Sequence, residues 1–361
     1  MGRPARHRPG RGAPLSCHHA PYGTPPGLPG ELARRRPDSR SGRKLDEDDV
    51  RVRPGRGSRP RTRTRPKHAD ATPGTVVAVD RGRYAVLVGD SRLTAVQARE
   101  LGRGSVVVGD RVAVVGDVSG GPDALARIVR VEERTTVLRR SADDADPFER
   151  VIVANADQLV VVTALADPPP RVGLIDRFLV AAYVGGLDPL LCLTKADLAA
   201  PDELLAAYAD LGTPAVSTER GGDLGPLLAR LAGRTSVLVG HSGVGKSTLI
   251  NELVPSAQRA VGVVSSIGRG RHTSSSAVAF ALAGGGWVID TPGIRSFGLA
   301  HVTPTVLLAA FPDLAEGAED CPRGCTHRSA AEGCRLDAYV AGGHSTPGRL
   351  ESFRRLLVAQ V

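Results

Sequence analysis

Short β-branched runs separated by Gly and Asp mark residues 72–133 of this 361-residue chain. Such runs with turn residues between them predict a small antiparallel barrel of about five strands, here of the oligonucleotide-binding (OB) type. The strand runs are residues 74–79, 84–88, 105–108 and 111–115. Tyr84 is the one aromatic residue between positions 72 and 131, whereas single-strand binders usually offer aromatic stacking surfaces. Any contact of this barrel with RNA is therefore expected to use the backbone and its shape.

A second pattern, in which apolar strands alternate with amphipathic helices, runs from about residue 157 to 296, inside a domain placed at residues 145–300. Strands are expected at 158–164, 189–193, 214–217, 236–239 and 287–289, and helices at 172–184, 202–210, 224–232 and 246–253. This alternation predicts a mainly parallel sheet that is covered on both faces. Chemistry is expected at the carboxyl ends of its strands.

The segment 303–361 is expected to form a small domain of short helices around a group of cysteines and a histidine. The apolar residues available for its small core are Phe311, Leu314, Tyr339, Leu350, Phe353 and Leu356. A bound metal would help to hold so small a unit together.

The formal charge of +9 is carried by the first part of the chain. Residues 1–70 hold 18 Lys and Arg against 7 Asp and Glu, and the remainder holds 29 against 31. This Arg-, Pro- and Gly-rich segment has few large apolar residues, so we predict a basic disordered tail, which suits a phosphate backbone or is simply solvated. The chain shows no apolar run of membrane-spanning length and no secretory signal, so we expect a cytoplasmic monomer without membrane contact.

A phosphate-binding loop follows the expected strand 236–239 and opens the expected helix 246–253. Its residues are Gly240, His241, Ser242, Gly243, Val244, Gly245, Lys246, Ser247 and Thr248. The glycines allow successive N–H groups to face phosphate oxygens at a helix N-terminus. We expect Lys246 to bridge the β and γ phosphates, Ser247 to ligate Mg²⁺ and Thr248 to reach the α phosphate.

The sequence Asp290-Thr291-Pro292-Gly293 follows the strand 287–289. Asp290 is expected to hold Mg²⁺ and the Gly293 amide to sense the γ phosphate, although this is also a good turn sequence. Ile294 stands where many GTPases carry a glutamine that orients water. A polar loop upstream of Asp290 therefore becomes the candidate for positioning the attacking water. In this loop His272 could orient or deprotonate the water, or it could be only a surface histidine. Thr273, the next residue, is expected to ligate Mg²⁺.

The sequence Thr194-Lys195-Ala196-Asp197 closes the strand 189–193 and is typical of a guanine-specific motif. Asp197 can accept the ring N–H and the exocyclic amino group of guanine together, and Lys195 would lie over the base. Thr194 replaces the more usual asparagine and removes an amide that braces the loop, so guanine preference is expected but not assured. Ser217 would offer its backbone N–H to the guanine oxygen.

Cys321, Cys325, His327 and Cys334 lie within fourteen residues and supply three thiolates and one imidazole. This is the ligand set of a closed structural zinc site, with free thiols as the less favoured alternative.

The base motif stands before the phosphate loop, which is the reverse of the order in ordinary small GTPases. With the Arg-His-Thr loop, Asp-Thr-Pro-Gly followed by Ile294, a preceding barrel and a following Cys/His cluster, the chain resembles the circularly permuted ribosome-biogenesis GTPases called RsgA or YjeQ. The resemblance covers about residues 45–361.

The resemblance implies a GTPase that binds the small (30S) ribosomal subunit and its 16S rRNA, acts late in the maturation of that subunit and is stimulated by it. It implies that residues 194–197 bind guanine, residues 240–248 bind phosphates and the Cys/His cluster binds zinc. In this chain the spacing between the first two cysteines, Cys321 and Cys325, is one residue shorter than in many members of the family, which makes Cys321 the least certain ligand. Two alternatives stay open: an RNA-binding assembly module that uses nucleotide only to set its shape, and an ATP-using kinase or transport-type ATPase.

Overall fold

The computed structural model describes residues 68–102, 104–121, 124–141, 149–255, 277–291, 298–299 and 302–359. Residues 65–361 form one compact unit, and the predicted basic tail lies almost entirely outside the described residues. No helix in the described ranges has the length and apolar character needed to cross a membrane.

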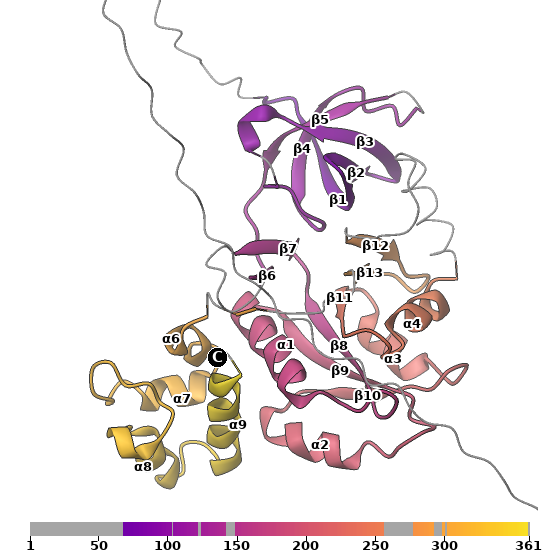
Figure 1. The fold of residues 1–361 in the computed structure, drawn as a ribbon. Helices are drawn as coiled ribbons and strands as arrows, with labels where there is room; N and C mark the ends of the chain where they lie inside the picture. The colour runs from indigo at the N-terminus through magenta and orange to yellow at the C-terminus, as the bar shows by residue number, and fades with distance from the viewer. Residues whose placement is uncertain are drawn as a thin grey trace, which may run out of the picture. The chain divides into compact units, whose positions relative to one another are not determined.

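A closed β-barrel forms the first described part of the chain (Figure 1). Its strands are β1 (Thr72–Asp80), β2 (Arg83–Val88), β3 (Ser91–Gln97), β4 (Arg111–Gly116) and β5 (Ala126–Val131). The barrel closes because β1 pairs with both β2 and β4, while β3 and β4 each pair with β5. Tyr84 is buried in the core of the barrel, with 4% of its surface exposed, so it offers no stacking surface to a nucleic acid.

The prediction of a strand at residues 105–108 is wrong. Val106 and Val108 are buried as the apolar pattern indicated, but only an isolated bridge, from Val108 to Val153, involves this segment. The Asp110 carboxylate accepts a hydrogen bond from the Val107 N–H at 2.8 Å and turns the chain there. The two strands that complete the barrel are instead β3 and β5.

A mainly parallel sheet follows, after a hairpin of β6 (Val137–Arg140) and β7 (Arg150–Ala154). Its strands are β8 (Gln158–Ala164), β9 (Asp188–Thr194), β10 (Ala215–Ser217), β11 (Thr235–Val239), β12 (Val278–Ala281) and β13 (Trp287–Asp290). They lie in the order β10-β9-β8-β11-β13-β12, and β12 alone runs antiparallel to its neighbour β13 within this set. The continuous sheet passes from β12 to β1 of the barrel.

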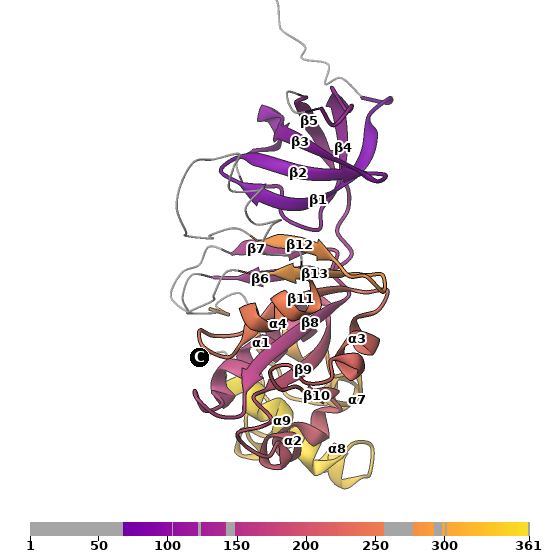
Figure 2. The ribbon, with the colours of Figure 1, turned by 90° about the vertical axis from the view of Figure 1, so that its right-hand side faces the viewer.

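Helices cover both faces of this sheet, as the alternating pattern predicted (Figures 1 and 2). They are α1 (Val172–Gly185), α2 (Asp202–Tyr208), α3 (Gly225–Leu231) and α4 (Lys246–Leu253). Successive residues of β8 point to opposite faces: Leu159 and Val161 pack with α1 and α2, whereas Val160 and Val162 pack with α3 and α4. Two cores therefore share this central strand.

The C-terminal part consists of α6 (Pro304–Leu308), α7 (Pro312–Gly317), α8 (Leu336–Ala341) and α9 (Pro347–Val358). The hydroxyls of Thr303 and Thr346 cap α6 and α9, each of which begins with proline. Of the residues expected in a small core, Tyr339 is only half-buried and stacks on His344, with ring centroids 4.6 Å apart.

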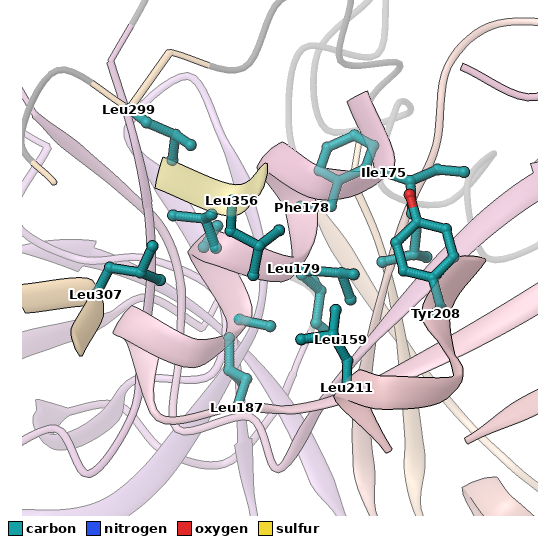
Figure 3. Close-up of a cluster of buried hydrophobic side chains, with 14 of the residues drawn as sticks. Leu159, Ile175, Phe178, Leu179, Leu187, Tyr208, Leu211, Leu299, Leu307 and Leu356 are labelled. Carbon is teal, nitrogen blue, oxygen red and sulfur yellow. The ribbon is translucent and has the colours of Figure 1, made fainter. Parts of the chain in front are cut away.

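The remaining apolar residues of this part do not form a separate small core. Leu307 and Leu356 belong to the same buried cluster as Phe178 and Leu179 of α1 (Figure 3). The ring of Phe311 lies 5.4 Å from Tyr183 of α1 and 5.3 Å from Phe353 of α9, measured between centroids. The C-terminal helices are thus packed on the outer face of α1.

Candidate functional site

The phosphate-loop sequence turns tightly between β11 and α4. A side chain on Gly240 would place its Cβ 2.5 Å from the Val162 carbonyl oxygen, so only glycine fits so close to β8. Gly243 and Gly245 have φ values of +87° and +91°, which L side chains rarely adopt. The loop can therefore expose its N–H groups at the start of the eight-residue helix α4.

Lys246, the first residue of α4, lies at the base of this loop with 8% of its surface exposed. Its ammonium contacts the carboxylate of Asp290, at the end of β13, and donates to the Thr291 carbonyl at 2.7 Å. The Thr291 hydroxyl in turn donates to the Leu238 carbonyl of β11 at 2.8 Å. The ends of two parallel neighbours, β11 and β13, thus bring together the expected phosphate-binding cation and the expected magnesium ligand.

Thr194, the first residue of the base motif, is connected directly to the phosphate loop. Its buried hydroxyl donates to the Val244 carbonyl at 2.5 Å and lies 3.3 Å from the Thr163 carbonyl of β8. The amide of the usual asparagine is absent from the sequence, but the threonine hydroxyl makes a brace of its own to this loop.

The rest of the base motif forms a loop after β9. Lys195 has a φ of +58°, and its ammonium contacts the Asp167 carbonyl in the loop that follows β8. The Ala196 N–H donates to the Thr218 carbonyl at 3.1 Å, which joins the base motif to the loop after β10. Asp197 is exposed toward the cleft described next.

One cleft of about 520 Å³ contains both the base motif and the phosphate loop. The residues that line it are Thr194, Lys195, Asp197, Leu198, Thr218, Glu219, Arg220, Gly243, Gly245, Ser247, Thr248, Leu249 and Glu252. Motifs that are distant in the sequence therefore meet where one nucleotide can touch both, at the carboxyl ends of the strands.

Two parts of this lining were not anticipated from the sequence. Ser217 ends β10, paired with Leu193, and the cleft is lined by Thr218, Glu219 and Arg220, which follow it. Glu252 lies one helical turn beyond Thr248 on α4, and its carboxylate is 3.4 Å from the Gly221 N–H. The i, i+4 spacing from the phosphate loop was the signal that could have found Glu252.

Several expected site residues lie outside the described residues: His272, Thr273 and Gly293. His241 is described, and its Nδ1 lies 2.8 Å from the carbonyl oxygen of Ser242.

The four Cys/His side chains lie together in the C-terminal part. The ligand atoms of Cys321, Cys325, His327 and Cys334 all lie within 4.8 Å of one another. The Sγ atoms of Cys321 and Cys334 are 3.9 Å apart, and the Sγ of Cys334 is 3.7 Å from Nδ1 of His327. A tetrahedral zinc with Zn–S bonds of about 2.3 Å needs sulfurs about 3.8 Å apart, so the donor set fits.

The surroundings of this cluster also suit a cation. The backbone N–H groups of His327 and Arg335 donate to the sulfurs of Cys325 and Cys321 at 3.4 and 3.3 Å. Burial, together with the neighbouring thiols, raises the pKa of Cys334 to about 11. Burial and the charge of Arg354 lower the pKa of His327, which favours the neutral imidazole that ligates metals. A bound cation would offset the cost of deprotonating these thiols.

Comparison with known proteins places these features in a family. The family model described as RsgA GTPase matches residues 131–300. The small ribosomal subunit biogenesis GTPase RsgA of Azotobacter vinelandii is 39% identical over 265 residues, which are 71% of this chain and 75% of the relative.

Solved structures agree with this match. YjeQ from Thermotoga maritima has a TM-score of 0.58 and 26% identity, over 80% of this chain and 98% of that one. YloQ, described as a circularly permuted GTPase, has a TM-score of 0.57 and 25% identity, over 81% of this chain and 96% of that one. The fold is accordingly that of a circularly permuted GTPase with a closed barrel before it, and the chain belongs to the RsgA family of GTPases.

Proposed function

We propose that this GTP-hydrolysing enzyme binds GTP across the cleft between residues 194–197 and the phosphate loop, and acts in maturation of the small (30S) ribosomal subunit. The observation that carries the proposal is the cleft of about 520 Å³, in which Thr194, Lys195 and Asp197 lie opposite Gly243, Gly245 and Ser247. The role in biogenesis of the subunit is taken from the relatives, which are named small ribosomal subunit biogenesis GTPases.

Each residue of the nucleotide site has a proposed role. Asp197 accepts the two guanine N–H donors, with Lys195 over the base and the loop after Ser217 toward the guanine oxygen. Lys246 bridges the β and γ phosphates, and the N–H groups from Gly240 to Thr248 hold the other phosphate oxygens. The position of Lys246 as the first residue of α4, directly after the glycines of the loop, supports this assignment.

Ser247, Thr273 and Asp290 would hold Mg²⁺, which neutralises phosphate charge when it is bound with GTP. His272 would position the attacking water, and the Gly293 amide would contact the γ phosphate. Ile294 has an apolar side chain and cannot take the water-positioning role.

We assign zinc to Cys321, Cys325, His327 and Cys334, where it would stabilise a part of the chain with short helices. The spacing of the four ligand atoms supports Cys321 as a ligand in spite of the shortened loop. The barrel is assigned to the OB type and is proposed to contact 16S rRNA through backbone and shape, since Tyr84 is buried. We propose that the protein binds the subunit as a monomer, in the cytoplasm.

The test is GTP hydrolysis by the purified protein with and without small ribosomal subunits. Subunits should accelerate hydrolysis by the parent, and His272→Ala should lose about 100-fold or more of the stimulated rate. His344→Ala is the matched control, because His344 stacks on Tyr339 in the C-terminal part and should leave the rate unchanged.

Tight GTP binding without any stimulation would reject the subunit-linked activity and favour the nucleotide-gated RNA-binding module. The names of the relatives do not favour that alternative. Displacement of bound GTP by ATP at equal concentration would reject the assignment of Asp197 and favour an ATPase.

A further inference from the structure

Two consecutive arginines on α9 have partners in different parts of the molecule. Arg354 donates through Nη1 and Nη2 to the two carboxylate oxygens of Asp337 at 2.8 and 2.6 Å. Its Nε donates to the carbonyl of His327 at 3.2 Å. Asp337 lies in the first turn of α8, and His327 is a member of the Cys/His cluster. The guanidinium of Arg354 therefore connects α9 to the backbone of the cluster by three directed bonds.

Arg355 has its partners in the GTPase domain. Its Nη1 donates to the Ala207 carbonyl of α2 at 2.9 Å, and its Cζ lies 4.8 Å from the ring centroid of Tyr208. Its Nε lies 3.3 Å from the Oδ2 of Asp176 on α1. The Tyr208 hydroxyl also donates to Asp176, at 3.0 Å. One side chain of α9 thus contacts both α1 and α2.

Asp176 makes this contact specific. Its side chain is 4% exposed, and a buried carboxylate requires a paired charge and hydrogen bonds. Arg355 supplies the paired charge and the Tyr208 hydroxyl supplies a hydrogen bond, and burial nevertheless leaves the pKa of Asp176 above its ordinary value. Leu356 and its neighbours already supply apolar packing of α9 on α1. The ion pair between Arg355 and Asp176 additionally fixes the position of α9 on α1, which apolar packing alone would leave less specific.

The two helices that Arg355 contacts both begin near the nucleotide cleft. The loop before α1 contains Asp167, whose carbonyl contacts the ammonium of Lys195. The base motif of residues 194–197 is separated from the start of α2 by four residues. The Tyr208 hydroxyl lies 3.4 Å from the Val172 carbonyl at the start of α1, which joins the two helices to each other. A displacement of α9 would therefore act on both helices that position the base-binding side of the cleft.

We propose that Arg354 and Arg355 connect the Cys/His cluster to the base-binding side of the nucleotide cleft, so that metal binding and guanine-nucleotide binding strengthen each other. The link runs from the His327 carbonyl through α9 to Asp176, Ala207 and Tyr208. Coupling of this kind is reciprocal: a nucleotide that holds α1 and α2 in place also raises the affinity of the cluster for metal, by the same free energy. The inference rests on the proposed metal and nucleotide sites and adds the residues that join them.

The test is the zinc affinity of the full chain, measured by equilibrium competition with a colorimetric chelator, with and without saturating GDP. GDP should raise this affinity about fivefold in the parent, the lower end of common coupling strengths. Arg355→Met should lose this nucleotide effect, because its contacts with Asp176 and Ala207 are gone. Arg354→Gln should lose it as well, although the hydrogen bonds of Arg354 described above, to His327 and Asp337, lie within the C-terminal part.

Arg349→Met is the matched control. Arg349 lies on the same helix, donates to Asp313 at 2.7 Å and stacks its guanidinium 5.0 Å from the ring centroid of Phe311. The carboxylate and the ring that it contacts lie in the C-terminal part, and it contacts neither Asp176 nor Ala207, so this variant loses an arginine, an ion pair and a ring contact without cutting the link. GDP should still raise its zinc affinity by the parental factor.

Three results would overturn the proposal: no nucleotide effect in the parent, an unchanged effect in Arg355→Met and Arg354→Gln, or an equal loss in Arg349→Met. Should Arg355→Met fail to fold, Arg354→Gln and Arg349→Met decide the question between them. If the parent protein binds no zinc, both the assigned metal site and this proposal are rejected. GTP hydrolysis in the same preparation then shows separately whether the proposed function stands.

Discussion

Replacing Thr194 by valine tests how the base motif and the phosphate loop are held at a fixed separation. Valine keeps the shape of threonine, so the packing at this position, which is 6% exposed, is retained and only the hydroxyl is lost. The change removes the 2.5 Å hydrogen bond to the Val244 carbonyl and the 3.3 Å contact with Thr163. We expect a loss of about 1–2 kcal/mol of free energy, because one neutral hydrogen bond is lost and a buried carbonyl is left without that hydrogen-bond donor.

That cost should appear mainly in nucleotide binding. A single GDP must touch both loops at once, and a cost of about 1–2 kcal/mol is a factor of about 5–30 in an equilibrium constant. Equilibrium titration with a fluorescent GDP measures this loss, and the free energy of unfolding in urea shows how much of the cost goes to the fold instead. ADP, whose base Asp197 does not recognise, should lose less affinity than GDP.

Thr194→Ser is the control for this experiment, because it keeps the donor and removes only a methyl group. GDP affinity of Thr194→Val within twofold of the parent would refute the bracing role. Equal losses in the serine and valine variants would assign the effect to packing and would refute it as well.

Three further outcomes are expected. Lys246→Ala should lower the rate of GTP hydrolysis by at least about 100-fold, measured by phosphate release, because no other described cation lies beside Asp290. Cys325→Ser should lower bound zinc, measured by metal analysis, well below one equivalent and reduce the melting temperature, whereas Cys192→Ser should leave the zinc content unchanged because Cys192 lies apart from the cluster. Burial acts to raise the pKa of Asp313, but hydrogen bonds from Arg349 and Ser345 outweigh it and hold that pKa below its ordinary value. This carboxylate therefore contributes stability above its unfolded pKa of about 3.9 that is lost as the pH falls through the lower folded value, and Asp313→Asn should flatten the acid side of the unfolding profile.

Local sequence patterns predicted the central sheet and the phosphate loop well. The continuous apolar run of residues 158–164 marks a strand buried on both faces, and the glycines before Lys246 mark a tight turn into a helix; β8 and α4 follow these signals. The barrel was harder to predict, because β3 mixes short polar and apolar residues, and because residues 106–108 are apolar yet form only an isolated bridge, from Val108 to Val153. Burial and strand pairing are different requirements, and β-branched composition reports the first.

The long-range contacts could not be predicted from the sequence. The hydroxyl of Thr194 meets a carbonyl 50 positions away, and Arg355 meets one 148 positions away. Neither residue lies in a periodic pattern whose partner can be named, since the contacts depend on how helices pack on a sheet. The Cys/His cluster was predictable because its four members lie close together in the sequence.

The packing of α9 on α1 has a consequence for how the protein is made. A chain that emerges from the ribosome N-terminus first presents α1 and its strand β8 before α9, together with the proposed base motif of residues 194–197. The phosphate loop arrives later, and the outer face of α1 receives Leu356 only when α9, the last helix of the described residues, has been synthesised. Between the synthesis of α1 and that of α9 the growing chain therefore carries an uncovered apolar helix face, and the proposed nucleotide site is complete only once the phosphate loop has followed the base motif.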